Sequence, residues 1–146
     1  MKVGIGSDHA GFELKQAIKI YLEGSMKIEV VDYGTDSKES VDYPEYGFKV
    51  ANAVAENEVD RGIVVCGTGI GISMAANKVK GVRAALCYDP YTAIMARKHN
   101  DANVLAIGAR TSQLENALAI VGLFMKTDYE GGRHQKRVDM INNYPS

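Results

Sequence analysis

Residues 61–79 read RGIVVCGTGIGISMAANKV, and this stretch decides the fold. The β-branched run at 61–66 is typical of a buried strand. Three glycines, Gly67, Gly69 and Gly71, follow it within five residues. Apolar residues at 72, 75, 76 and 79 then recur at helical spacing. The stretch therefore predicts a strand, a tight glycine loop and a helix.

The same alternation runs along the whole chain. Further strands are predicted at Lys2–Ser7, Lys27–Tyr33, Val82–Cys87 and Val104–Ala109. Helical periodicity covers 14–22 and 114–125, Asp89-Pro90 and Asp42-Tyr43-Pro44 are helix starts, and an alanine- and valine-rich helix is predicted at 45–57.

Strict alternation of strands and helices predicts an α/β fold with a doubly wound five-stranded parallel sheet. This is a three-layer sandwich of the flavodoxin/Rossmann-like type, and we expect the strand order 2-1-3-4-5. Gly131-Gly132 then breaks the chain before a C-terminal helix. Residues 1–146 are expected to form a single domain.

The bulk composition excludes several classes of function. The 17 Lys+Arg residues nearly balance the 18 Asp+Glu residues, which argues against nucleic acid or an anionic membrane as partner. We expect no membrane span and no signal peptide. Cys66 and Cys87 form no C-x-x-C pair, which favours free thiols in a reducing cytoplasm. With three scattered histidines they show no zinc-site spacing, so no metal is expected.

In a parallel α/β sheet, ligands bind beyond the carboxyl ends of the strands. Cys66 ends its strand just before a helix N-terminus, where the thiolate form is favoured. The glycines let backbone N–H groups converge on one oxygen. Ile72 occupies the position where a dinucleotide fingerprint or a P-loop needs its next glycine. A base beside an oxyanion hole suits enolisation. On residue types alone, close helix–strand packing explains the glycines equally well.

The tail EGGRHQKRV, residues 130–138, carries a second signal. Arg133 and Arg137 share one face of the expected helix, and with His134 they place cations at its N-terminus. That placement favours a bound phosphate over a solvated basic face. Spacing alone assigns no role to His99, which can be an ordinary helix C-terminal cation, or to Asp8, which can be only a helix cap.

Several longer motifs carry a resemblance to a known family. SDHAG at 7–11, DYP at 42–44, CGTGIGISMAANK at 66–78, KHNDANVLAIGAR at 98–110 and EGGRHQKRV at 130–138 occur in order over essentially the whole chain. Together they resemble the ribose/galactose isomerase family, which includes the ribose-5-phosphate isomerases B and the galactose-6-phosphate isomerase subunits. Some members carry a glutamate base inside the glycine loop. In this chain Ile72 stands at that position and Cys66 is present. The chain therefore resembles the members of the family that have a cysteine as the base.

The resemblance implies an aldose–ketose isomerase of the pentose phosphate pathway. It would work without metal or cofactor, through a cis-enediolate. The implied catalytic residues are Cys66 as the base, Asp8 and His99 for ring opening, and Thr68. The implied substrate-binding residues are Asp8, His9, Tyr43, Gly67, Thr68, Gly69, Ile70, Gly71, Asn100, Arg110, Arg133, His134 and Arg137. The family is dimeric or a dimer of dimers, so the resemblance also implies homodimers with shared active sites.

Two alternatives to ribose 5-phosphate isomerisation stay open at the level of sequence. The substrate can be allose 6-phosphate or galactose 6-phosphate with the same mechanism. The chain can also be a non-catalytic phosphosugar-binding module, although such a module has no use for a thiol beside the glycine loop.

Overall fold

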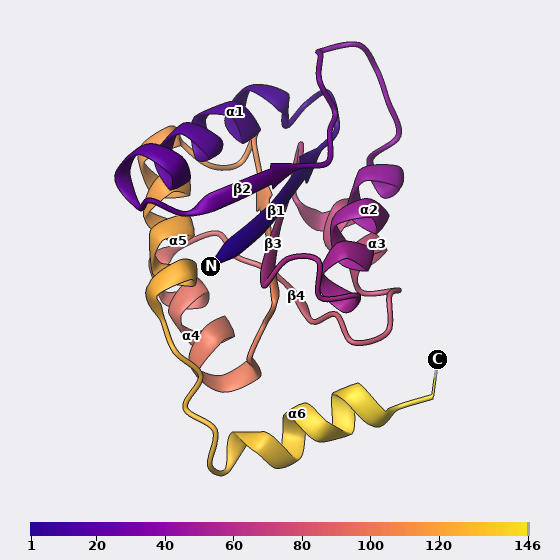
Figure 1. Cartoon of the computed structure of the whole chain (residues 1–146), viewed down its shortest axis with the longest axis vertical. Helices are drawn as coiled ribbons and strands as arrows, with labels where there is room; N and C mark the ends of the chain where they lie inside the picture. Colours follow the sequence, from indigo (N-terminus) through magenta and orange to yellow (C-terminus); the bar gives the residue numbers. More distant parts are fainter. Residues whose placement is uncertain (146) are drawn as a thin grey trace.

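Five parallel strands form one sheet, and helices cover both of its faces (Figure 1). The structure is a computed structural model that describes residues 1–145. The strands are β1 (Lys2–Ser7), β2 (Glu29–Asp32), β3 (Arg61–Cys66), β4 (Ala84–Leu86) and β5 (Val104–Gly108). The helices are α1 (Phe12–Ile20), which continues into the π-helical turn η1 (Tyr21–Ser25), α2 (Tyr43–Ala55), α3 (Ile70–Ala76), α4 (Pro90–Asn100), α5 (Leu114–Lys126) and α6 (His134–Asn143).

The sheet separates two hydrophobic cores, as the predicted sandwich requires. On one face α1, α4 and α5 pack against the strands, with Ile18 and Phe124 fully buried. On the other face α2 and α3 pack against the strands, with Val50 and Ile72 fully buried. Each such side chain contributes about 1.5–3 kcal/mol on burial. Both cores therefore hold the strand ends, where the site lies, in fixed positions.

The expected strand order was wrong at one edge. The observed order is β2-β1-β3-β5-β4, so β5 lies between β3 and β4. All five residues of β5 are buried, whereas the three residues of β4 are only partly buried. A short, partly exposed strand belongs at a sheet edge, and a fully buried strand belongs in the interior. Because β5 rather than β4 is the neighbour of β3, the carboxyl end of β5 lies directly beside the carboxyl end of β3.

The helix signals were largely confirmed. Asp89 caps α4, because its Oδ1 accepts from the Thr92 N–H at 2.7 Å. The alanine-rich helix exists as α2, beginning at Tyr43. Gly131 and Gly132, at φ 65° and 56°, separate α5 from α6. Three strands are shorter than predicted: β2 begins at Glu29, β4 begins at Ala84, and β5 ends at Gly108.

Within residues 1–145 no helix combines the length and the apolar character needed to cross a membrane.

Candidate active site

One pocket of about 380 Å³ lies at the carboxyl ends of the strands and gathers many of the predicted site residues. It is lined by Asp8, Tyr43, Cys66, Gly67, Thr68, Ile70, Gly71 and Arg110. These residues come from β1, α2, β3 with the loop after it, and the segment after β5. The neighbouring ends of β1, β3 and β5 are what bring them together, because Gly6 pairs with Val64 and Cys66 pairs with Gly108.

Cys66 lies at the floor of this pocket, 4% exposed. The backbone N–H of Gly69 donates to its Sγ at 3.2 Å. Gly69 has φ 77°, and a Cβ there would lie 2.8 Å from the Ile107 carbonyl carbon. The left-handed backbone and the lack of a side chain are thus both needed to turn this N–H toward the sulfur.

The glycine loop also fits closely against its neighbours. A Cβ on Gly71 would lie 2.5 Å from the ring of Tyr43, so the missing side chain leaves room for that ring at the pocket wall. A Cβ on Gly67 would lie 3.1 Å from Nη1 of Arg110. The backbone N–H of Arg110 also donates to the Gly67 carbonyl at 2.8 Å. The loop therefore fixes a phenol and a guanidinium beside the thiol.

Asp8 and His9 follow β1 directly, at the same edge of the sheet. Oδ1 of Asp8 accepts from the Gly11 N–H at 3.0 Å, and the carboxylate is buried. Nδ1 of His9 accepts from the Val41 N–H at 3.1 Å. A neutral His9 therefore carries its proton on Nε2, where it can donate to an anion. Asp8 is not the N-cap of α1, because Gly11 holds that position without a side-chain cap hydrogen bond, and the Asp8 side chain instead lines the pocket.

Cys87 differs from Cys66 in its surroundings. It belongs to the core between the sheet and α4, and burial raises the pKa of its thiol to about 11. An ordinary thiol in that position stays protonated at neutral pH. Cys87 is therefore a packing residue, as its sequence context indicates.

The second half of the predicted site lies elsewhere in the chain. His99 and Asn100 end α4 just before β5 begins, and β5 starts beside Gly62 at the amino end of β3. Asn142 of α6 accepts from Arg83 at 2.9 Å beside the amino end of β4, so α6 lies at this same end (Figure 1). A five-residue strand such as β5 spans roughly 16 Å. Within one chain, His99 and the residues of α6 therefore lie at the far end of the sheet from Cys66.

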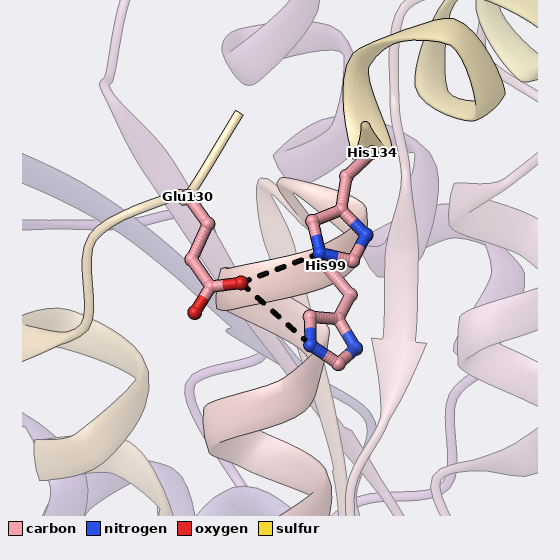
Figure 2. Close-up of side chains that lie close together, drawn as sticks. All are labelled: His99, Glu130 and His134. Carbon is pink, nitrogen blue, oxygen red and sulfur yellow. Dashed lines mark ion pairs between the residues drawn. The ribbon is translucent and has the colours of Figure 1, made fainter. Parts of the chain in front are cut away.

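In this second group the side chains divide into exposed and buried ones. Arg133 and Arg137 are exposed on the first turns of α6, whereas His134 is buried and stacks on His99. The Glu130 carboxylate lies to one side of the stacked rings and faces both imidazoles (Figure 2). The sequence reasoning gave Glu130 no role. Its spacing of four residues from His134 is the signal that could have identified it.

Comparisons with known proteins agree with this geometry. The family model described as Ribose/Galactose Isomerase matches residues 3–141. Ribose-5-phosphate isomerase B of Escherichia coli (strain K12) is 53% identical over 140 residues, which is 96% of this chain and 93% of that protein. The structure of Clostridium thermocellum ribose-5-phosphate isomerase B has a TM-score of 0.95 at 56% identity, covering 97% of this chain and 95% of that one.

One solved relative carries a sugar phosphate. The structure of ribose-5-phosphate isomerase B from Mycoplasma genitalium, with bound ribulose-5-phosphate, has a TM-score of 0.94 at 45% identity. It covers 98% of this chain and 95% of that one. These matches cover nearly the whole of this chain and nearly the whole of each relative. The chain belongs to the ribose/galactose isomerase family.

Proposed function

We propose that this chain is an aldose–ketose isomerase that interconverts ribose 5-phosphate and ribulose 5-phosphate. The observation that carries the proposal is the thiol of Cys66 in a pocket with Asp8, hydrogen-bonded by the N–H of the glycine loop. The relatives named as ribose-5-phosphate isomerase B, one with bound ribulose-5-phosphate, support this substrate. The reaction belongs to the pentose phosphate pathway.

The chemistry divides between the two ends of a sugar phosphate. With Asp8 assisting, His99 donates a proton to the ring oxygen and opens the furanose. The Cys66 thiolate removes the proton from C2, and the electron pair moves onto the carbonyl oxygen to give a cis-enediolate. The proton of the O2 hydroxyl then passes to O1, the C2 carbonyl forms, and the proton held by Cys66 returns at C1, which yields the ketose. Thr68, Tyr43 and Asn100 contact the sugar hydroxyls.

The glycine loop stabilises the enediolate oxygen. Gly69 and Ile70 already donate their N–H groups to Cys66 Sγ and Thr68 Oγ1. The N–H groups of Gly67, Thr68 and Gly71 therefore carry the proposed contacts to the oxygen. A pocket wall of glycine backbone lets the substrate oxygen approach these groups closely.

A homodimer, or a dimer of dimers, supplies the rest of the site. Because His99, Arg133 and Arg137 lie at the opposite end of the sheet from Cys66 in one chain, we propose that they act on the site of a partner subunit. Arg133 and Arg137 bind the phosphate with His9, and Arg110 and His134 support them. The mechanism needs no metal or cofactor. Two free thiols fit a cytoplasmic enzyme, and we propose that residues 1–146 act as one isomerase domain.

The alternatives differ in substrate and in turnover. We would compare kcat/KM for ribose 5-phosphate, allose 6-phosphate and galactose 6-phosphate on the purified protein. The proposal requires the highest value for ribose 5-phosphate, and a preference for either hexose phosphate would reassign the substrate. A binding module would bind the sugar phosphate without converting it, in wild type and in Cys66→Ala alike. The isomerase loses turnover in Cys66→Ala while ligand binding is retained.

A further inference from the structure

A compact cluster of possible metal ligands lies at the end of the sheet opposite Cys66. His99 is near the end of α4, Glu130 lies in the connection between α5 and α6, and His134 is the first residue of α6. Figure 2 shows both imidazoles directed at the same carboxylate. Oε1 of Glu130 is 3.3 Å from Nε2 of His134 and 3.8 Å from Nε2 of His99. One ligand atom from each residue lies within 4.8 Å of the others.

The cluster is held by backbone contacts. The N–H of Glu130 donates to the carbonyl of Lys98 at 3.1 Å, which ties the α5–α6 connection to the end of α4. The N–H of His134 donates to the carbonyl of Gly131 at 3.1 Å, which closes the turn at the start of α6. The end of α4 therefore meets the segment 130–134 from much further along the chain, and this separation is why sequence spacing does not place His99 in the cluster.

His134 is an incompletely satisfied buried group. It is 7% exposed, and its Nε2 has no hydrogen-bond partner among residues 1–145 although the atom is hidden from solvent. The polar atom it faces is the Glu130 carboxylate. Burying an imidazole nitrogen without a hydrogen bond costs free energy, so such an atom calls for a partner. A ligand bound between His134 and Glu130 would supply it.

The spacing of these atoms fits a tetrahedral ion. Zinc binds imidazole nitrogen and carboxylate oxygen so that neighbouring ligand atoms are ~3.4 Å apart. The separation of Glu130 from His134 already matches this value, and that of Glu130 from His99 is a few tenths of an ångström longer. The two rings are stacked, with centroids 4.2 Å apart and planes 17° apart. The ring planes are thus nearly parallel, and the less buried ring, His99, must turn to complete the site.

We propose that His99, Glu130 and His134 form a binding site for a transition-metal ion such as Zn²⁺, and that this ion inhibits the isomerase. Two imidazoles and one carboxylate select zinc, cobalt, nickel or copper over magnesium and calcium. A water molecule takes the fourth position. The inhibitory part rests on the proposed function, because metal-bound His99 can no longer donate a proton. The binding part rests on the cluster alone.

Binding is tested separately from activity. Cobalt is titrated into the chelator-treated wild-type protein, with calorimetry and the visible spectrum as readouts. We expect one ion per chain, tetrahedral cobalt bands and no thiolate-to-cobalt charge transfer. Glu130→Gln, which changes an exposed side chain, and His134→Asn should each weaken binding at least tenfold. Asp139→Asn is the matched control for Glu130→Gln. It also removes one negative charge, from an exposed residue of α6 outside the cluster, and should leave the affinity unchanged.

Two binding results would overturn the site. One is equal affinity in Glu130→Gln, His134→Asn and Asp139→Asn. The other is a thiolate charge-transfer band in the bound wild-type protein, which would assign the ion to a cysteine. Since Glu130 is exposed, its variant keeps the test valid even if His134→Asn does not fold.

Inhibition is measured with ribose 5-phosphate and Zn²⁺. We expect turnover to fall as zinc is added, to recover with EDTA, and to need at least tenfold more zinc in Glu130→Gln. Equal zinc sensitivity in Glu130→Gln and wild type, or full turnover with the cluster loaded, would overturn the inhibitory part. If wild type does not isomerise ribose 5-phosphate at all, the proposed function fails while the cobalt titration still decides the site.

Discussion

The backbone N–H of Gly69 points at the sulfur of Cys66, with 3.2 Å between nitrogen and sulfur. This contact depends on the left-handed backbone of Gly69, which also caps α3. Because α3 spans only seven residues, the direct hydrogen bond matters more for the thiol than the length of the helix behind it. The geometry of one glycine is therefore linked to the environment of the proposed base.

Gly69→Ala tests this link. A Cβ at this position lies 2.6 Å from a methyl group of Leu86 and 2.8 Å from the carbonyl carbon of Ile107, and φ is 77°. The left-handed conformation alone costs about 1–2 kcal/mol for alanine. We expect the loop to shift, kcat/KM to fall at least tenfold, and the free energy of unfolding to fall by more than the conformational cost. Enzyme assays and urea denaturation measure the two effects.

Two other glycines serve as controls for Gly69→Ala. Gly81 has φ 90° with open space around its Cβ position, so Gly81→Ala should show the conformational cost alone. Gly24 also has open space and no positive φ, so Gly24→Ala should be neutral or slightly stabilising. If Gly69→Ala behaves like Gly81→Ala in both assays, the loop does not depend on close packing at Gly69.

The two cysteines should react very differently. Cys66→Ser should lower isomerisation by orders of magnitude, because a serine hydroxyl is a far weaker base, while the fold and phosphate binding survive. In that variant Cys87 is the remaining thiol. Burial raises the pKa of Cys87 to about 11, so iodoacetamide should label it slowly at neutral pH and faster as the pH rises toward that value. Mass spectrometry measures the labelling.

Cys87→Ala completes the comparison and should keep near-wild-type turnover. Rapid labelling of Cys87 at neutral pH would contradict its place as a buried packing residue, and high turnover in Cys66→Ser would return Cys66 to a packing role. Asp8 would then be the next group to test as the base.

The periodicity of the sequence predicted the strands and helices because buried strands and amphipathic helices have different repeats. β1 and β3 have the predicted limits, since both are apolar runs bounded by turns or charges. The position of β5 could not be read in this way. Periodicity reports which residues are buried and is silent on which strands are neighbours. The full burial of β5 was the usable signal for an interior strand.

The site was predictable only in part for a related reason. Residues that follow strand ends, such as Asp8, Cys66 and Arg110, meet because the sheet topology requires it. His99 carries no such constraint, and only the family resemblance gave it a role. Arg137 was singled out by the cations at the start of its helix, a signal that does not say which strand ends it would serve. The pairing of Glu130 with His99 depends on how the segment before α6 packs against the end of α4, which no local pattern encodes.

The basic residues of α6 should act through phosphate. A charge-assisted hydrogen bond contributes about 1.5–3 kcal/mol, so Arg137→Ala should lower kcat/KM by roughly 10–150-fold. Inorganic phosphate should also inhibit the variant less strongly. Lys136→Ala is the matched control, since Lys136 is exposed on the same turn and is assigned no contact. An unchanged phosphate inhibition constant in Arg137→Ala would remove it from the site.

Asp32 should matter for stability. Nζ of Lys15 is fully buried and lies 2.6 Å from the Asp32 carboxylate. Asp32→Asn leaves that ammonium without its counter-charge, and we expect the free energy of unfolding to fall by about 3 kcal/mol. The control is Asp60→Asn, since the Asp60 carboxylate accepts from the backbone N–H of Lys2 at an exposed site. Equal effects in the two variants would mean that Lys15 does not depend on Asp32.

The pH dependence of the Asp32 effect has a fixed sign. Burial raises the pKa of Asp32, but hydrogen bonds from Lys15 and Lys19 outweigh it, and the net pKa lies below its ordinary value. The stabilisation is therefore fully present above the unfolded-state pKa of about 3.9 and is lost as the pH falls through the lower folded-state value. Urea titrations should show the gap between wild type and Asp32→Asn closing on acidification below this range. A gap that stays constant with pH would exclude Asp32 as its source.

The last prediction concerns the division of the site between subunits. Cys66 ends β3, whereas His99 precedes β5 at the opposite end of the sheet, so one chain cannot bring them together without unfolding. Cys66→Ala and His99→Asn should each be inactive alone. In a hybrid dimer, one site collects both substitutions and the other has neither. Random exchange of equal amounts makes half of the dimers hybrids, so activity should return to about a quarter of the wild-type value. Mixing each variant with itself is the control, and native mass spectrometry verifies exchange. If hybrids form and activity stays at the level of the single variants, His99 does not serve the partner's thiol, and the ring-opening proton must come from the same chain as Cys66, with Asp8 the nearest acid in the pocket.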